Sequence, residues 1–131
     1  MQQFQVRTSG RTDLQDITTE VRDAVGKLAV SDGVVTIFTP HTTAGVTINE
    51  NADPDVVHDM LKVLDEVIPF SHPAYRHMEG NSAAHIKSSL VGCSQSVIVE
   101  NGRLQLGTWQ GIYFAEFDGP RTRKVWVAAS V

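Results

Sequence analysis

The sequence predicts one α+β domain, residues 1–131, in which helices pack on one side of a compact antiparallel or mixed β-sandwich-like sheet. Two observations predict this class. Apolar residues at helical spacing are concentrated in the first two thirds of the chain, whereas the last third is rich in strand-forming residues. The chain also has 131 residues, 41% of them hydrophobic and 20% charged, which suits one domain with a substantial core.

The first four elements follow from periodicity. Residues 2–8 alternate loosely and suit a strand, and Ile17 to Leu28 has the apolar spacing of a helix. The apolar, β-branched run 33–39 is typical of a central strand, or of a strand whose outer face meets another subunit. A further strand is expected over 44–49.

Two more helices follow from their end signals. Asp53-Pro54 is a strong helix start, because aspartate is a good N-cap and proline fits the first helical position. Pro69 should end this helix. A second, short helix is expected over 82–91, with Asn81 as its cap. The first of these helices carries one apolar stripe, made of Val57, Met60, Leu61, Leu64 and Ile68.

A hairpin is expected in the last third of the chain. Asn101-Gly102 is the sequence signal of a type I′ turn. A turn there pairs Val99 with Leu104 and Val97 with Leu106 on one apolar face. The hairpin adds two strands to the predicted sheet.

Two final strands, 111–117 and 123–129, are expected to be joined by a short turn. The period of two places Glu116 and Asp118 on one face of the first strand, and a turn centred on Gly119-Pro120 would place Glu116 opposite Arg123 and Asp118 opposite Arg121. One interpretation is two cross-strand ion pairs, which contribute little if they are exposed. The other is that one or both arginines hold a phosphate through forked hydrogen bonds.

Composition excludes several classes of protein. The 11 basic and 15 acidic residues give a net charge of −4, and without a basic cluster the chain is a poor candidate for a nucleic-acid binder. No stretch approaches the roughly 20 apolar residues of a membrane span, and the N-terminus lacks a signal-peptide run. The sole cysteine, Cys93, cannot form an intrachain disulfide, and we expect a buried thiol in a cytoplasmic protein.

Three histidines are the strongest candidates for chemistry. His41 lies in a loop of small hydroxyl residues after an apolar strand, where it could contact a ligand or only hydrogen-bond to a turn. His77 and His85 flank Glu79 and the start of the short helix. A helix N-terminus favours neutral imidazole, the form that binds a metal, and its free N–H groups could hold a phosphate. The alternative is that His77 and His85 are surface residues whose hydrogen bonds are already made and which bind no ligand.

Two further features could contribute to a site. Gly107 and Gly111 bracket Thr108, Trp109 and Gln110, so that the indole could stack on a ligand ring and the amide could contact its edge. An anchoring role for the tryptophan in the core or at a subunit interface is equally consistent. A helix-borne carboxylate such as Asp59 can also project into a neighbouring cleft.

Three segments resemble one known family. They read HTTAGVTINENADPDV, HMEGNSAAHIKSSLVG and GRLQLGTWQGIYFAEFDGPRTRKVWV, and run from His41 almost to the C-terminus. The sequence resembles the YjbQ family, often labelled secondary thiamine-phosphate synthase. The resemblance implies a β-rich α+β sandwich that assembles as a homotrimer, with a site that neighbouring subunits could share. Relatives often carry a further histidine where this chain has Arg76.

The resemblance and the residues together predict a metal-assisted enzyme acting on a phosphorylated small molecule, in the manner of a thiamine-phosphate synthase. Histidine ligands favour zinc, whereas magnesium prefers oxygen. The alternatives are a metal- or metabolite-binding trimeric module without turnover, and a trimeric scaffold whose polar residues form interface ion pairs. The expected roles are metal binding by His41, His77 and His85; proton transfer by Glu79 or Asp59; neutralisation of anionic oxygens by Arg121 and Arg123; and substrate contacts by His41, Asn81, Thr108, Trp109 and Gln110.

Overall fold

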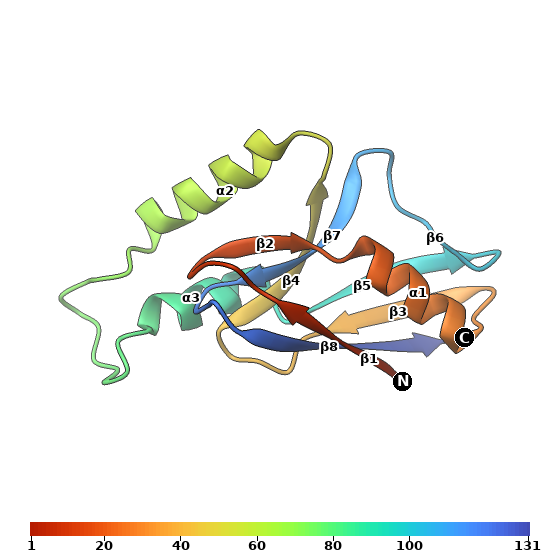
Figure 1. The fold of residues 1–131 in the computed structure, drawn as a ribbon, viewed down its shortest axis with the longest axis horizontal. Coiled ribbons are helices and arrows are strands. Elements are labelled where there is room, and N and C mark those ends of the chain that lie inside the picture. Colours follow the sequence, from red (N-terminus) through yellow and green to blue (C-terminus); the bar gives the residue numbers. More distant parts are fainter.

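The structure is a computed structural model that covers residues 1–131. Its strands and helices form two antiparallel sheets with three helices (Figure 1). The strands are β1 (Gln2–Arg7), β2 (Asp13–Asp16), β3 (Gly33–Phe38), β4 (Ala44–Glu50), β5 (Ser94–Glu100), β6 (Arg103–Leu104), β7 (Gln110–Glu116) and β8 (Thr122–Ser130); the helices are α1 (Thr18–Leu28), α2 (Pro54–Val67) and α3 (Ser82–Val91).

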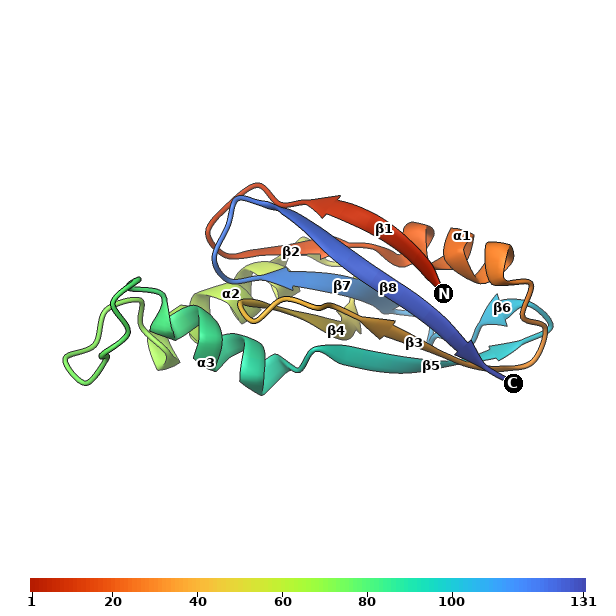
Figure 2. The ribbon, with the colours of Figure 1, turned by 90° about the horizontal axis from the view of Figure 1, so that it is seen from below.

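The main core lies between the two sheets. One sheet has the order β1-β8-β3-β5-β6 and the other the order β2-β7-β4. Along β3, Val35 and Ile37 point into the core, while Val34 and Thr36 are exposed on the outer face. Helix α1 closes one end of the core (Figure 2). The buried core includes Val6, Val35, Ile37, Val97, Val99, Val125 and Val127 from the first sheet, Ala44, Val46, Ile112 and Phe114 from the second, Ile17, Val21, Ala24 and Val25 from α1 and its start, and Val30 after α1.

The helices are distributed differently from the prediction. The α+β sandwich is confirmed, but it consists of two sheets, and the helices do not all cover one side. Helix α3 packs against β4, and its Ala84 joins Ala115 and Phe117 in a second, smaller cluster. Helix α2 stands apart from the sheets (Figure 1), and none of its residues is buried. Its predicted apolar stripe is therefore only partly covered within one chain.

Strands β7 and β8 are consecutive but belong to different sheets. Strand β7 pairs with β2 and β4, whereas β8 pairs with β1 and β3. The connection between them therefore crosses from one sheet to the other, and does not form the hairpin that the sequence suggested. Residues 111–117 are buried on both faces, because one face meets the core and the other meets the smaller cluster under α3.

The turn after β5 has the predicted geometry over a shorter length. Asn101 and Gly102 both have positive φ, 52° and 74°, as a type I′ turn requires. The pairing of Val99 with Leu104 is confirmed. The pairing of Val97 with Leu106 is wrong, because β6 ends at Leu104. Strand β2 was not predicted, since its sequence, DLQD, has little strand character.

The N-cap predicted for α2 is confirmed, whereas the one predicted for α3 is confirmed only in position. Asp53 caps α2 by accepting a hydrogen bond of 2.9 Å from the Asp55 amide. Asn81 does precede α3, but its side chain makes no capping bond and donates instead to Asp118. Cys93 is exposed, not buried as expected. No helix has the length and apolar character needed to cross a membrane.

Candidate functional site

Three segments that are distant in the sequence line one polar cavity of about 450 Å³, the histidine–arginine cavity. They are the loop after β3, the segment leading into α3, and the connection from β7 to β8. The lining is largely polar, and Pro40 is its one apolar residue. The lining residues are Pro40, His41, Thr42, Thr43, His77, Glu79, Asn81, His85, Asp118, Arg121 and Arg123, which include every predicted site residue from these three segments.

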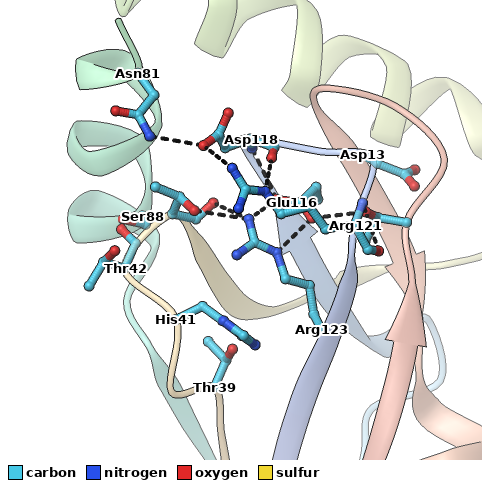
Figure 3. Close-up of polar contacts among 12 residues, drawn as sticks. Asp13, Thr39, His41, Thr42, Asn81, Ser88, Glu116, Asp118, Arg121 and Arg123 are labelled. Atoms are coloured by element: carbon cyan, nitrogen blue, oxygen red, sulfur yellow. Dashed lines mark hydrogen bonds and ion pairs between the residues drawn. The ribbon is translucent and has the colours of Figure 1, made fainter. Parts of the chain in front are cut away.

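A buried ion pair underlies this cavity (Figure 3). Glu116 is 0% exposed and the side chain of Arg123 is 4% exposed. Arg123 Nε donates to Glu116 Oε1 over 2.8 Å, and Nη2 contacts Oε2. Thr8 Oγ1 also donates to Oε1, over 2.8 Å. The predicted Glu116–Arg123 pair is thus confirmed, but it crosses between the two sheets and is buried, so the small contribution expected of an exposed pair does not apply.

Hydrogen bonds keep Glu116 ionised despite its burial. Burial alone would raise the pKa of this carboxyl, because it disfavours the charged form. Donation from Arg123, from the Asp118 backbone amide and from Thr8 outweighs that effect and lowers the pKa below its ordinary value. The carboxylate in turn neutralises Arg123. The guanidinium also donates from Nη2 to Thr43 Oγ1 over 2.9 Å, which ties the His41 loop to β8.

Arg121 is the arginine with more freedom to meet a ligand. Its side chain is about half exposed. Nε donates to the Asp118 carbonyl oxygen over 2.7 Å and Nη2 to Asp118 Oδ2 over 2.9 Å, which confirms the predicted Asp118–Arg121 contact. Both bonds orient the guanidinium without enclosing it, and a guanidinium has five N–H donors. Donors therefore remain for an anion in the cavity.

His41 is held by a backbone contact that defines its tautomer. Its Nε2 accepts a hydrogen bond of 2.9 Å from the Lys124 amide. Burial lowers the pKa of His41, and the positive charge of Arg123 lowers it further, against the opposing influence of Glu116. The neutral ring then carries its proton on Nδ1. Its Nε2 lone pair is already engaged by the amide, so this ring suits donation to an anion better than ligation of a metal.

His77 and His85 come together as predicted. Their ring centroids are 5.3 Å apart and their planes meet at 79°. Both side chains line the histidine–arginine cavity together with Glu79. No group of three or more His, Cys, Asp or Glu side chains is arranged to hold a metal ion in this chain. The expected set of His41, His77 and His85 is therefore not assembled as a three-ligand site.

Four predicted site residues lie elsewhere. Gln110 pairs with Glu50 at one end of β7, whereas Glu116 pairs with Ala44 at the other. At about 3.3 Å per residue these ends are roughly 20 Å apart, so the segment Thr108, Trp109 and Gln110 does not reach the cavity in one chain. Trp109 is 62% exposed. Asp59 is exposed on α2 and interacts with its neighbour His58. Within one chain, these four residues are therefore not among those that line the cavity with His41.

Some of the contacts that shape the site were not predicted. Thr8 reaches Glu116 across 108 positions of sequence, and no local pattern indicates such a contact. The contact between Asp118 and Arg121 was predicted, but the hydrogen bond of 2.9 Å that Asp118 Oδ2 also accepts from Asn81 Nδ2 was not. This carboxylate thus links the start of α3 to the β7–β8 connection. A polar residue flanking a helix start is compatible with many partners, so the sequence alone could not identify this one.

The fold and the cavity define an α+β protein of two antiparallel sheets, with a polar site where the sheets and α3 meet. Residues 2–130 match the family model described as UPF0047 protein YjbQ-like, and the chain belongs to this family. It is 60% identical to UPF0047 protein YugU of Bacillus subtilis over 124 residues, which cover 95% of this chain and 94% of that protein. UPF0047 protein YjbQ of Salmonella typhimurium is 43% identical over 112 residues, 80% of each chain.

Solved structures show the same fold. The crystal structure of an uncharacterized conserved protein of the same family from Clostridium acetobutylicum has a TM-score of 0.96 and 57% identity, and the match covers 99% of this chain and 100% of that one. A conserved hypothetical protein from Thermus thermophilus has a TM-score of 0.92 and 44% identity, again over 99% and 100% of the two chains. The family resemblance seen in the sequence is thereby confirmed.

Proposed function

We propose that the protein is an enzyme acting on a phosphorylated small molecule, whose phosphate binds in the histidine–arginine cavity. One observation carries this proposal: Arg121 and His41, whose Nε2 is engaged by the Lys124 amide so that the neutral ring has Nδ1–H as its free donor, line the same largely polar cavity. Phosphate oxygens accept several hydrogen bonds, and guanidinium donors bind them strongly because both partners are charged. Arg123 contributes mainly by holding the cavity wall, since Glu116 neutralises it.

Proton transfer is assigned to the other titratable side chains that line the cavity. His77 and His85 lie against each other and Glu79 lines the same space. Imidazole and carboxylate groups are the common general acids and bases of enzymes. The reaction class that the family resemblance implies is thiamine-phosphate synthase-like transfer. In that reaction the thiazole nitrogen forms a bond to a carbon of the aminopyrimidine substrate. The bond between this carbon and its diphosphate oxygen breaks, and Arg121 stabilises the negative charge of the departing diphosphate.

A metal-binding function is a second candidate, supported by the His77–His85 contact. Two adjacent imidazoles suit zinc better than magnesium, which prefers oxygen ligands. One chain supplies these two nitrogen donors, fewer than the three protein ligands typical of catalytic zinc. Stoichiometric zinc in purified protein that is lost in His85→Ala would favour this candidate.

Self-association is the third part of the proposal, in the form of the homotrimer that the family resemblance implies. The outer face of the five-stranded sheet supports it. Val34 pairs with Ile98 on that face, where Ile98 is 63% exposed, and Phe38 stacks on Trp126 with ring centroids 5.6 Å apart. Light scattering coupled to size exclusion measures the mass directly, and a mass close to the 14.3 kDa of one chain would contradict the trimer.

The phosphate site is tested by titrating inorganic phosphate into the protein by calorimetry. Arg121→Gln should weaken binding by about tenfold or more, because a hydrogen bond to a charged group is lost. Arg103→Gln is the matched control, since this arginine lies away from the cavity on β6. Equal phosphate affinity in the two variants would contradict the proposed site.

Turnover is tested separately from binding. The aminopyrimidine diphosphate and thiazole phosphate are supplied together, and release of pyrophosphate is followed. Loss of product in His85→Ala, with phosphate binding and fold retained, supports the enzyme. Phosphate binding without any product in the unsubstituted protein supports the non-catalytic metabolite-binding module instead.

A further inference from the structure

A second cavity of about 370 Å³ lies next to the histidine–arginine cavity and has a different character. The turn between β1 and β2 contributes Arg11, the segment after α2 contributes Phe70, α3 contributes Lys87, and Phe117 follows β7. The two cavities share Asn81 and Asp118, which hydrogen-bond to each other over 2.9 Å (Figure 3). That contact forms part of the wall between them. The volume is in the range of small-molecule sites, roughly 300–1,000 Å³.

Lys87 is an unusual lining residue because its side chain is only 4% exposed. Lysine is rarely buried unless it is paired. Its Nζ contacts Asp65 Oδ1 of α2, and this is the one hydrogen bond that the ammonium group makes. An ammonium group has three N–H donors. Two donors are thus left without a protein acceptor in a side chain that lines the cavity.

Arg11 supplies a second positive charge without an acidic partner. Its guanidinium carbon lies 4.0 Å from the centroid of the Phe70 ring, and the arginine forms no ion pair. The two carboxylates of the cavity are already paired, Asp65 with Lys87 and Asp118 with Arg121. The cavity therefore has one uncompensated positive charge, held in position by an aromatic ring, and this favours an anion.

Two aromatic rings and two alanines form the apolar part of the lining, beside the polar Thr12 and Asn81. Phe117 is buried, and its ring centroid lies 6.0 Å from Lys87 Nζ. Phe70 is about half exposed at the mouth, and two alanines of α3 complete this side. Aromatic walls bind flat apolar groups by stacking or by edge contacts. We infer that this cavity binds a small aromatic anion, with its charged group on Arg11 and Lys87 and its ring between Phe70 and Phe117.

The inference is tested with benzoate, followed by amide chemical shifts in two-dimensional NMR. Benzoate should shift the amides of Thr12, Lys87 and Phe117. Acetate lacks the ring and benzamide lacks the charge, so each should bind about tenfold more weakly or not at all. The inference is overturned if benzoate leaves these amides unshifted, or if the three compounds bind alike.

Two substitutions identify the cavity and separate it from the phosphate site. Arg11→Gln changes an exposed side chain and should weaken benzoate binding by about tenfold, while inorganic phosphate still binds. Lys87→Met should do the same, and its dispersed amide spectrum must first show that it folds. Arg103→Gln, in a separate cavity, serves as the control. Benzoate affinity unchanged in Arg11→Gln would refute the assignment, whereas failure of the phosphate titration alone would leave it standing.

Discussion

The buried Glu116–Arg123 pair predicts a large loss of stability when only one partner is removed. Arg123→Met keeps a long apolar side chain but leaves the carboxylate buried without its counter-charge. Removal of one member of a buried pair costs roughly 3–5 kcal/mol of unfolding free energy. Thr8 and the Asp118 amide would still donate to the carboxylate. We therefore expect a loss of about 3 kcal/mol, at the lower end of that range.

The pH dependence provides an independent check on the same substitution. In the unsubstituted protein the pKa of Glu116 is lowered, so its contribution to stability is present above the unfolded value of 4.5 and is lost as pH falls through the folded value. In Arg123→Met the buried Glu116 carboxylate has fewer hydrogen-bond donors and no counter-charge. Its protonation at low pH therefore removes an unfavourable buried charge. The difference in stability between the two proteins should therefore shrink as the pH is lowered below about 4.5.

Urea unfolding at fixed protein concentration measures both effects, because any self-association would otherwise contribute to the midpoint. Lys124→Met is the matched control, since it makes the same type of change at the exposed neighbour on β8 and should shift stability by less than about 0.5 kcal/mol. A cost below about 1 kcal/mol for Arg123→Met at pH 7 would refute the reasoning. A cost that is independent of pH would refute it as well.

Three further predictions follow from local geometry. His41→Gln should reduce the pH dependence of stability between pH 5 and 7.5. Burial and Arg123 lower the pKa of His41, so the unsubstituted protein loses unfolding free energy as pH falls below about 6.5. An unchanged dependence of the unfolding free energy on pH, measured by urea unfolding, would contradict this. Gly45→Ala should cost about 1–3 kcal/mol of unfolding free energy, since its Cβ would lie 2.6 Å from the Gly92 carbonyl oxygen. Gly26→Ala in α1 meets nothing within 4 Å and should add about 0.5–1 kcal/mol. A thermal midpoint that rises for Gly45→Ala would contradict the first expectation, and one that falls for Gly26→Ala would contradict the second. Asp53→Ala should cost about 1 kcal/mol by removing the N-cap of α2, and hydrogen exchange in the first turn of that helix should accelerate; unaltered exchange there would count against the cap.

The sequence predicted best those features that depend on neighbouring residues. The start at Asp53-Pro54, the bounds of α3 and the turn at Asn101-Gly102 are all encoded within a few positions. The sheet assignment of β7 was missed for the opposite reason. Its continuous burial reflects contacts with both the core and the smaller cluster, and no local pattern specifies which strands will flank it.

The site was predicted in part on the same basis. The loop with His41 and the segment from His77 to His85 each contain several polar residues, and their meeting in one cavity was expected. Their distance from Trp109 could not be predicted, because it depends on the register of β4 against β7. The tautomer of His41 depends on the Lys124 amide, which lies 83 positions away and has no signature in sequence.

Strand β7 sets a fixed span between two chemically distinct neighbourhoods. Ion pairs and imidazoles gather at its Glu116 end, while the exposed indole of Trp109 precedes its Gln110 end. Groups more than about 10 Å apart without shared contacts change stability or binding independently, so their free-energy effects add. Substitutions of Trp109 and His41 should be additive if each chain acts by itself. A departure from additivity would mean that the Gln110 end of β7 in one chain meets the Glu116 end of β7 in another, as in a ring of identical chains.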